Sequence, residues 1–128
     1  MIIRLPWPKR ELSPNARVHH FPKARAVKAY RTGCAWEAKA QGVGRIKADR
    51  LPVTITFHPP DNRRRDRDNL IASFKAGADG IADVIGVDDS KWEPTYRVGD
   101  AVKGGCVVVL IDISKAPVSV PFRGQING

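Results

Sequence analysis

Two aspartates stand two residues apart directly behind three consecutive arginines, in the segment RRRDRDN at residues 63–69. On an extended chain, side chains i and i+2 point the same way, so the carboxylates of Asp66 and Asp68 can converge. Carboxylates that share a site repel each other, whereas a divalent cation favours having both ionised. Magnesium prefers oxygen ligands and needs only one or two protein carboxylates beside water and phosphate oxygens. The spacing therefore indicates a magnesium site, and the arginines would bring a phosphate to it.

The same residues have a simpler interpretation. Aspartate and asparagine commonly cap helix N-termini, so Asp68 or Asn69 could cap a following helix while Asp66 pairs with a neighbouring arginine. The spacing of the two aspartates does not choose between a cap and a metal site. A third acid close to them would favour the metal site.

Asp88 and Asp89, in GVDDS at 86–90, are the candidates for that third acid. They lie beyond the far end of the helix that we expect after the first two acids. A helix of about 16 residues is about 24 Å long, so the chain has to travel back to bring the two pairs together. A pair of aspartates before a serine is also a common turn. The sequence leaves the placement of this pair open.

Lys75 is the candidate cation. It follows Asp68 by seven residues and precedes Asp79 by four, so the three share one polar face of a continuous helix. A helical lysine leans toward the N-terminus, which shortens the ~10 Å between these backbone positions. The ammonium could then touch a phosphate held at the metal, or it could simply be solvated.

The surrounding elements predict an α+β fold in one compact domain, with a small mixed β-sheet packed with two main helices. Strand patterns occur at 2–5, 52–59, 95–100 and 105–113. The last two strands could form a hairpin through Gly99 to Gly105. Helical patterns occur at 23–41 and at about 69–84. Gly77 and Gly80 weaken the second helix by roughly 1 kcal/mol each, so we expect it to pack closely against another element.

The composition indicates a basic globular protein. The chain has 128 residues, 42% of them hydrophobic, and a formal net charge of +9, which suits a single domain that attracts polyanions such as nucleic acid. The most apolar stretch, at 106–113, is interrupted by Asp112 and is too short to span a membrane. We therefore expect a cytoplasmic protein with no membrane partner.

Other residues that often do chemistry give no pattern here. Cys34 and Cys106 lack the spacing of a zinc site or a disulfide framework, so we expect two reduced, buried thiols. No partner spacing supports zinc binding by the three histidines, and we assign them no chemistry. The three tryptophans, Trp7, Trp36 and Trp92, are expected in the core or in a dimer interface rather than stacked on bases.

Four stretches, taken in order, resemble the RusA family of Holliday junction resolvases, especially the shorter RusA-like proteins of phages and prophages. They are LPWP at 5–8, SPN at 13–15 with the basic segment after it, HPPDNRRRDRDNL at 58–70 and GVDDS at 86–90. The resemblance covers roughly the first hundred residues. It implies a homodimeric endonuclease that uses Mg²⁺, with Mn²⁺ as a substitute and without an organic cofactor, and resolves branched DNA by paired symmetric nicks. Residues 1–113 would form the nuclease domain and 114–128 a loosely ordered tail.

The resemblance also assigns residues. Asp66, Asp68 and Asp89 match the family's metal-binding acids, with Asp88 held in reserve. A family lysine four residues after the second acid matches Ala72, which is a departure, and Lys75 is expected to join the three acids as the fourth catalytic residue. Contacts with DNA are expected at Asn15, Arg17, Lys23, Arg25, Arg63, Arg64, Arg65 and Asn69.

Two other functions stay open. A basic nucleic-acid-binding protein without catalysis would use the acids only as caps and ion-pair partners. A nuclease that acts on ordinary duplex or on RNA would keep the site and lose the branched substrate.

Overall fold

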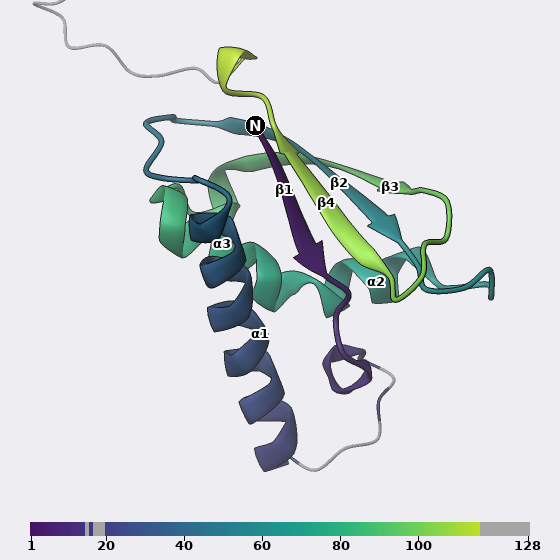
Figure 1. Ribbon diagram of the computed structural model, residues 1–128. Coiled ribbons are helices and arrows are strands. Elements are labelled where there is room, and N and C mark those ends of the chain that lie inside the picture. Colours follow the sequence, from purple (N-terminus) through teal and green to yellow (C-terminus); the bar gives the residue numbers. More distant parts are fainter. Residues whose placement is uncertain (15, 17–19, 116–128) are drawn as a thin grey trace, which may run out of the picture.

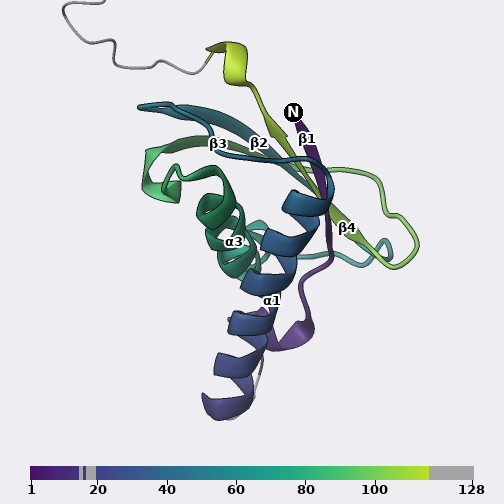
Figure 2. The same ribbon diagram turned by 60° about the vertical axis from the view of Figure 1, so that its left-hand side comes forward.

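Alternation of apolar and less apolar residues builds the central strand, β2 (Leu51–His58), which buries every second side chain. The structure, a computed structural model, describes residues 1–14, 16 and 20–115. It is an α+β fold in which one sheet carries the helices on a single face, as two views of the molecule agree (Figures 1 and 2). The predicted fold class and the mixed sheet are confirmed.

The sheet has four strands in the order β1-β4-β2-β3. β1 (Ile2–Pro6) and β2 both pair antiparallel with β4 (Cys106–Ile111), while β3 (Trp92–Val98) pairs parallel with β2. The predicted hairpin between β3 and β4 is therefore wrong. The apolar run of β4 suits an inner strand, whereas β3 contains Pro94 and is largely exposed, as an edge strand should be.

The predicted first helix is present as α1 (His20–Ala40), and it packs against the second helical region. A Cβ atom added at Gly80 would lie 2.3 Å from the Arg31 carbonyl oxygen and 3.2 Å from the Ala35 backbone nitrogen. The backbones of the two helices therefore approach each other so closely that only glycine fits. This confirms the close packing expected from the glycines.

The second predicted helix is two helices, α2 (Arg67–Ser73) and α3 (Lys75–Ile85), divided at Phe74. The Phe74 ring is buried and makes edge contacts with Tyr30 and Phe57, at centroid distances of 6.3 and 6.1 Å. The break places Lys75 at the start of α3, so Asp68 and Lys75 do not share one continuous helical face.

The remaining elements are three short 3-10 helices: η1 (Arg10–Leu12), η2 (Asp89–Lys91) and η3 (Ile113–Lys115). The predicted loop at 86–92 thus contains η2, and the predicted tail begins within η3. The rest of that tail, 116–128, lies outside the described residues. Among the helices described here, none is long and apolar enough to cross a membrane.

Both cysteines are buried and unpaired, as predicted. Burial raises the pKa of the Cys34 thiol to about 12, which suits an inert core residue. Trp92 is also buried, and its indole Nε1 donates a hydrogen bond to the Val87 carbonyl at 3.1 Å. Trp36 is 69% exposed on α1, so it does not lie in the core of the chain, and the expected alternative of a dimer interface stays a prediction.

Candidate active site

Asp66 ends the extended segment that follows β2 and serves as the N-cap of α2. Its Oδ1 accepts a hydrogen bond from the backbone nitrogen of Asp68 at 2.8 Å. The cap anticipated from the sequence therefore exists, but Asp66 provides it instead of Asp68 or Asn69. Since the helix begins at Arg67, the i, i+2 rule for extended chains does not apply to the two carboxylates.

The arginine run is held by Asp61, an acid that the sequence did not single out. Arg65 Nη1 lies 3.0 Å from Asp61 Oδ1, and Arg63 Nε lies 3.3 Å from the same oxygen. Hydrogen bonds from Arg65 and then Arg63 hold the pKa of the Asp61 carboxyl well below its usual range. Arg64 is exposed. The expected pairing of Asp66 with a neighbouring arginine does not occur among the described residues.

Lys75 forms the centre of an acidic cluster. Its Nζ lies 2.9 Å from Asp79 Oδ1, one helical turn further along α3, and also bonds to Asp89 Oδ2 in η2. The hydrogen bond with Asp89, followed by that with Asp79, raises the pKa of the Lys75 ammonium. The chain does return after α3, and it brings the second aspartate pair to the lysine.

The two aspartates of that pair have different roles. Asp88 caps η2, and its Oδ2 accepts a hydrogen bond from the Ser90 backbone nitrogen at 3.0 Å. Hydrogen bonding to Ser90 lowers the pKa of the Asp88 carboxyl. Asp88 thus behaves as the turn residue of the simpler interpretation, whereas Asp89 is the member that meets Lys75.

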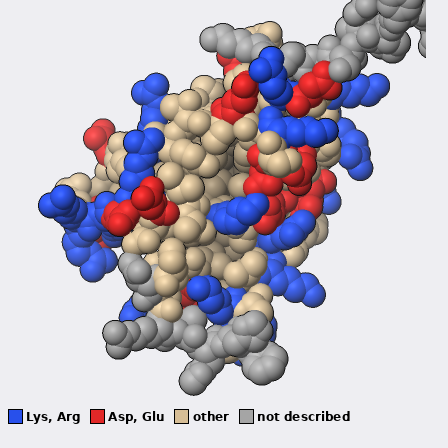
Figure 3. Space-filling view, turned by 180° about the vertical axis from the view of Figure 1, so that it is seen from behind, with Lys and Arg blue, Asp and Glu red and all other residues tan. Residues whose placement is uncertain are grey.

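A small hollow of about 80 Å³ lies between Lys75 and Asp89 on one side and α2 on the other, and neither Asp66 nor Asp68 lines it. Its lining includes Ile71 at the end of α2, Lys75 and Asp89, and Tyr96 of β3. Asp68 precedes Ile71 by one helical turn, so its helix borders the hollow that contains Asp89. Figure 3, the view from behind, shows acidic side chains gathered among lysines and arginines.

The acids do not form a ready-made metal site. Within residues 1–14, 16 and 20–115, no group of three or more His, Cys, Asp or Glu side chains is placed to hold one ion. Asp66 is engaged as a cap, and Asp89 is engaged by Lys75. The three-acid ligand set implied by the resemblance therefore does not fit the side chains as they stand.

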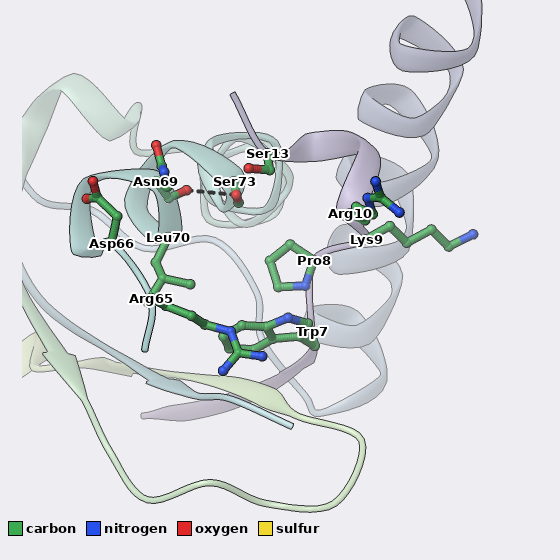
Figure 4. Close-up of a pocket in the computed structure, with 10 residues that line it drawn as sticks. All are labelled: Trp7, Pro8, Lys9, Arg10, Ser13, Arg65, Asp66, Asn69, Leu70 and Ser73. Atoms are coloured by element: carbon green, nitrogen blue, oxygen red, sulfur yellow. Dashed lines mark hydrogen bonds between the residues drawn. The ribbon is translucent and has the colours of Figure 1, made fainter. Parts of the chain in front are cut away.

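The residues expected to contact DNA are spread over several elements. Arg25 is exposed and Lys23 is half-buried, both on the N-terminal part of α1. Arg65 and Asn69 line a second hollow with Trp7 (Figure 4). Asn15 and Arg17 lie outside the described residues. Trp7 stands in the LPWP stretch of the resemblance, but it was expected in the core or in a dimer interface. The i, i+4 spacing of Lys75 and Asp79 was a visible signal for their pairing.

The fold and site define an α+β protein with a four-stranded mixed sheet and a lysine-centred acidic cluster. No family model matches the chain. A protein of Xylella fastidiosa strain Temecula1, described as uncharacterized, is 40% identical over 113 residues, which cover 85% of this chain and 74% of that protein. The chain belongs to the same family as this Xylella protein.

Proposed function

We propose that this protein is a structure-selective endonuclease that cuts branched DNA, with the four-way Holliday junction as its substrate in recombination and repair. The proposal combines the resemblance to the RusA family with one structural observation. Lys75 bonds to Asp79 and Asp89 at a hollow that is also bordered by α2, the helix that begins at the cap residue Asp66.

The proposed catalytic residues are Asp66, Asp68, Asp89 and Lys75. Hydrolysis of a phosphodiester needs a group that orients or deprotonates the attacking water, and a positioned carboxylate can do this. The Lys75 ammonium, at 61% side-chain exposure, can also reach a phosphate and offset the negative charge that develops on it. Arg64, two residues before Asp66 in the chain, is exposed, and it would contact the DNA backbone and help to fix its position.

We also propose that cleavage requires Mg²⁺, for which Mn²⁺ can substitute. This requirement rests on the resemblance and on donor chemistry, because magnesium needs only one or two carboxylates beside water and phosphate oxygens. The three acids do not share one ion in the structure, so we assign no catalytic step to the metal.

A homodimer completes the proposal. Paired symmetric nicks in a four-way junction need two active sites related by a two-fold axis, and a C2 dimer supplies them. Sedimentation of the full chain, whose mass is 14.1 kDa, would test this part separately from activity.

One alternative has a specific observation in its favour. Asp66 works as a helix cap and Asp61 as the partner of two arginines, which is how acids would be used in a basic DNA-binding protein without catalysis. Such a protein would bind branched DNA and cut nothing.

Replacing Asp68 by asparagine separates the two functions. Cleavage and binding of an end-labelled junction are measured for the wild type and for Asp68→Asn, with Mg²⁺, with Mn²⁺ and with chelator. Glu93→Gln is the matched control, because it removes the same charge from an exposed position on β3. The proposal predicts that Asp68→Asn loses cleavage by 100-fold or more, on the order of a general acid–base contribution, and binds as well or better because a negative charge near phosphate is gone.

The results distinguish the two functions clearly. Cleavage that persists in Asp68→Asn at the level of Glu93→Gln removes Asp68 from the site. Tight junction binding by the wild type with no cleavage in any metal supports the non-catalytic alternative.

A further inference from the structure

A second hollow lies on the other side of α2, away from Lys75. It encloses about 280 Å³ between η1 and α2, and Trp7, Arg10, Arg65, Asn69 and Leu70 are among its lining residues. Ligand pockets in proteins usually measure about 300–1,000 Å³, so this hollow suits one small ligand and excludes a duplex. Of the proposed catalytic residues, Asp66 is among its lining residues, whereas Asp68, Lys75 and Asp89 are not.

One side of the hollow is formed by Trp7 and by the Arg65 guanidinium, which lies over its ring. The Arg65 guanidinium carbon lies 5.8 Å from the centre of the Trp7 ring, and Arg65 Nη1 is held by Asp61 at 3.0 Å. The ring meets Phe57 edge-on, at a centroid distance of 6.4 Å, and a Cβ atom added at Gly105 would touch it at 3.0 Å. Flat aromatic and guanidinium groups are the surfaces on which proteins stack unpaired bases.

The other sides carry polar and cationic groups. Figure 4 shows Asn69, Ser73 and Ser13 across the hollow from Trp7 and Arg65, with Lys9 and Arg10 on a third side, where the Lys9 side chain points outward. The Asn69 amide can hydrogen-bond to the edge of a base, whereas the Ser73 hydroxyl donates to the Asn69 carbonyl at 2.7 Å and can only accept. The two cations can attract the phosphate of the nucleotide. A stacking surface, polar groups and nearby cations are together the recognition chemistry of a nucleotide.

We propose that this hollow is a subsite for a single unpaired nucleotide of a DNA strand, with its base stacked on the surface formed by Trp7 and Arg65. The proposal rests on the proposed function in one respect, because it takes DNA as the ligand. An unpaired nucleotide bound here would lie beside the first turn of α2, so the subsite would hold a strand next to Asp66. Branched DNA has such unpaired or easily unpaired nucleotides at its branch point.

Photocrosslinking tests the proposal without altering the protein. An oligonucleotide that carries one 5-iododeoxyuridine is irradiated with the full-length wild-type protein in chelator, and the crosslinked residue is identified by mass spectrometry. Trp36 is the internal control, since its 69% exposure makes it the better target for random encounters. We expect the adduct at Trp7, at several times the yield at Trp36. Crosslinks at Trp36 without any at Trp7, or no DNA binding at all, would overturn the proposal.

Affinity measurements with single-stranded DNA add a second readout. Trp7→Leu should weaken binding by about 5- to 100-fold, the usual effect of losing one stacked base. Trp7→Phe should stay within about 3-fold of the wild type, and Trp36→Leu should change nothing. Circular dichroism checks that each variant is folded. If Trp7→Leu is unfolded, the crosslink with the wild-type protein alone tests the subsite. Equal affinity of Trp7→Leu and wild type, with both folded, contradicts the subsite.

The source of the nucleotide is tested in the same way. The free mononucleotide is tested at the concentration at which the oligonucleotide labels Trp7. If it labels Trp7 equally well, the ligand of the subsite is a free nucleotide and not a DNA strand. Because chelator is present throughout, these outcomes do not depend on cleavage. A Trp7 adduct in a protein that never cuts DNA supports the nucleotide subsite and contradicts the endonuclease activity. Cleavage of DNA without a Trp7 adduct supports the endonuclease activity and contradicts the subsite.

Discussion

Asp66 carries two roles that a single substitution can separate. Its Oδ1 caps α2 through the Asp68 backbone nitrogen at 2.8 Å, while its carboxylate charge belongs to the proposed active site. Asparagine caps helices as well as aspartate does, whereas alanine does not. The side chain therefore offers one variant that keeps the cap and loses the charge.

We expect Asp66→Asn to keep the free energy of unfolding within about 0.5 kcal/mol of the wild type, because the cap survives, and to lose junction cleavage. Asp66→Ala should lose cleavage and also about 1 kcal/mol of stability, as typical for a removed cap. Urea unfolding and the cleavage assay measure both effects. An Asp66→Asn protein that cuts like the wild type would leave Asp66 with the structural role alone.

The sequence placed Lys75 and Asp79 on one helical face, and it left the ammonium either at a phosphate or solvated. Residues at i and i+4 are neighbours on any α-helix, so this spacing also allowed the ion pair that the structure has. The hold of Asp61 on Arg65 depends on how the irregular segment between β2 and α2 is folded, and no periodic pattern describes such a segment. The hydrogen bond between Lys75 and Asp89 forms because the chain returns after α3. No local sequence pattern predicts this return.

The break at Phe74 is the element-scale feature beside the cluster. With the break, α3 starts at Lys75, and η2 returns Asp89 to that start. The buried Phe74 ring, packed against Tyr30 and Phe57, is a tertiary contact, and helical periodicity does not encode it.

The contact between α1 and α3 predicts opposite effects at two helical glycines. Gly80→Ala should destabilise the protein by about 1–3 kcal/mol, as overpacking does, because its Cβ would lie 2.3 Å from the Arg31 carbonyl oxygen. Gly33→Ala in α1 is the matched control, since nothing lies within 4 Å of its added Cβ. This second variant should gain up to about 1 kcal/mol from helix propensity. Thermal and urea unfolding compare the two, and equal effects would contradict the packing described here.

The ion pair between the same helices predicts a pH dependence. Arg31 Nε and Nη2 each lie 2.8 Å from an oxygen of Asp83, and these hydrogen bonds lower the pKa of the Asp83 carboxyl. A lowered carboxyl pKa adds stability above the unfolded value of 3.8, and this stability is lost as the pH falls through the folded value. Both side chains are 48% exposed, so the pair contributes at most about 1 kcal/mol.

We therefore expect Asp83→Asn to be less stable than the wild type at pH 7 and equally stable once the pH is well below 3.8. Urea unfolding across this range measures the difference. Glu37→Gln, at an exposed position on α1, should not show it. A difference between Asp83→Asn and wild type that stays constant down to pH 2 would exclude the ion pair as its cause.

Across the whole molecule, the net charge of +9 coexists with an acidic cluster on one face (Figure 3). A basic surface attracts DNA at long range, whereas a local group of acids repels phosphate unless a cation stands among them. Lys75 is such a cation in the structure. The global charge was readable from composition, but the gathering of acids on one face required the fold.

The order of the strands in the sheet could not be predicted from the sequence. The four strands were visible as local patterns, but their order was not, because β3 and β4 are consecutive in sequence and are separated by β2 in the sheet. Burial decided the order, since β4 is apolar enough for an inner place and β3 is not. A site assembled from α2, α3 and η2 depends on that long-range arrangement.

Cleavage of an end-labelled four-way junction, beside a linear duplex of the same sequence, tests the central claim most directly. The account predicts paired nicks at symmetric positions in the junction alone, in the presence of Mg²⁺ or Mn²⁺ and not in chelator. Equal cleavage of the linear duplex would contradict the branched substrate. If the wild-type protein binds the junction tightly in Mg²⁺ and in Mn²⁺ but does not cut it, the proposed endonuclease activity is contradicted.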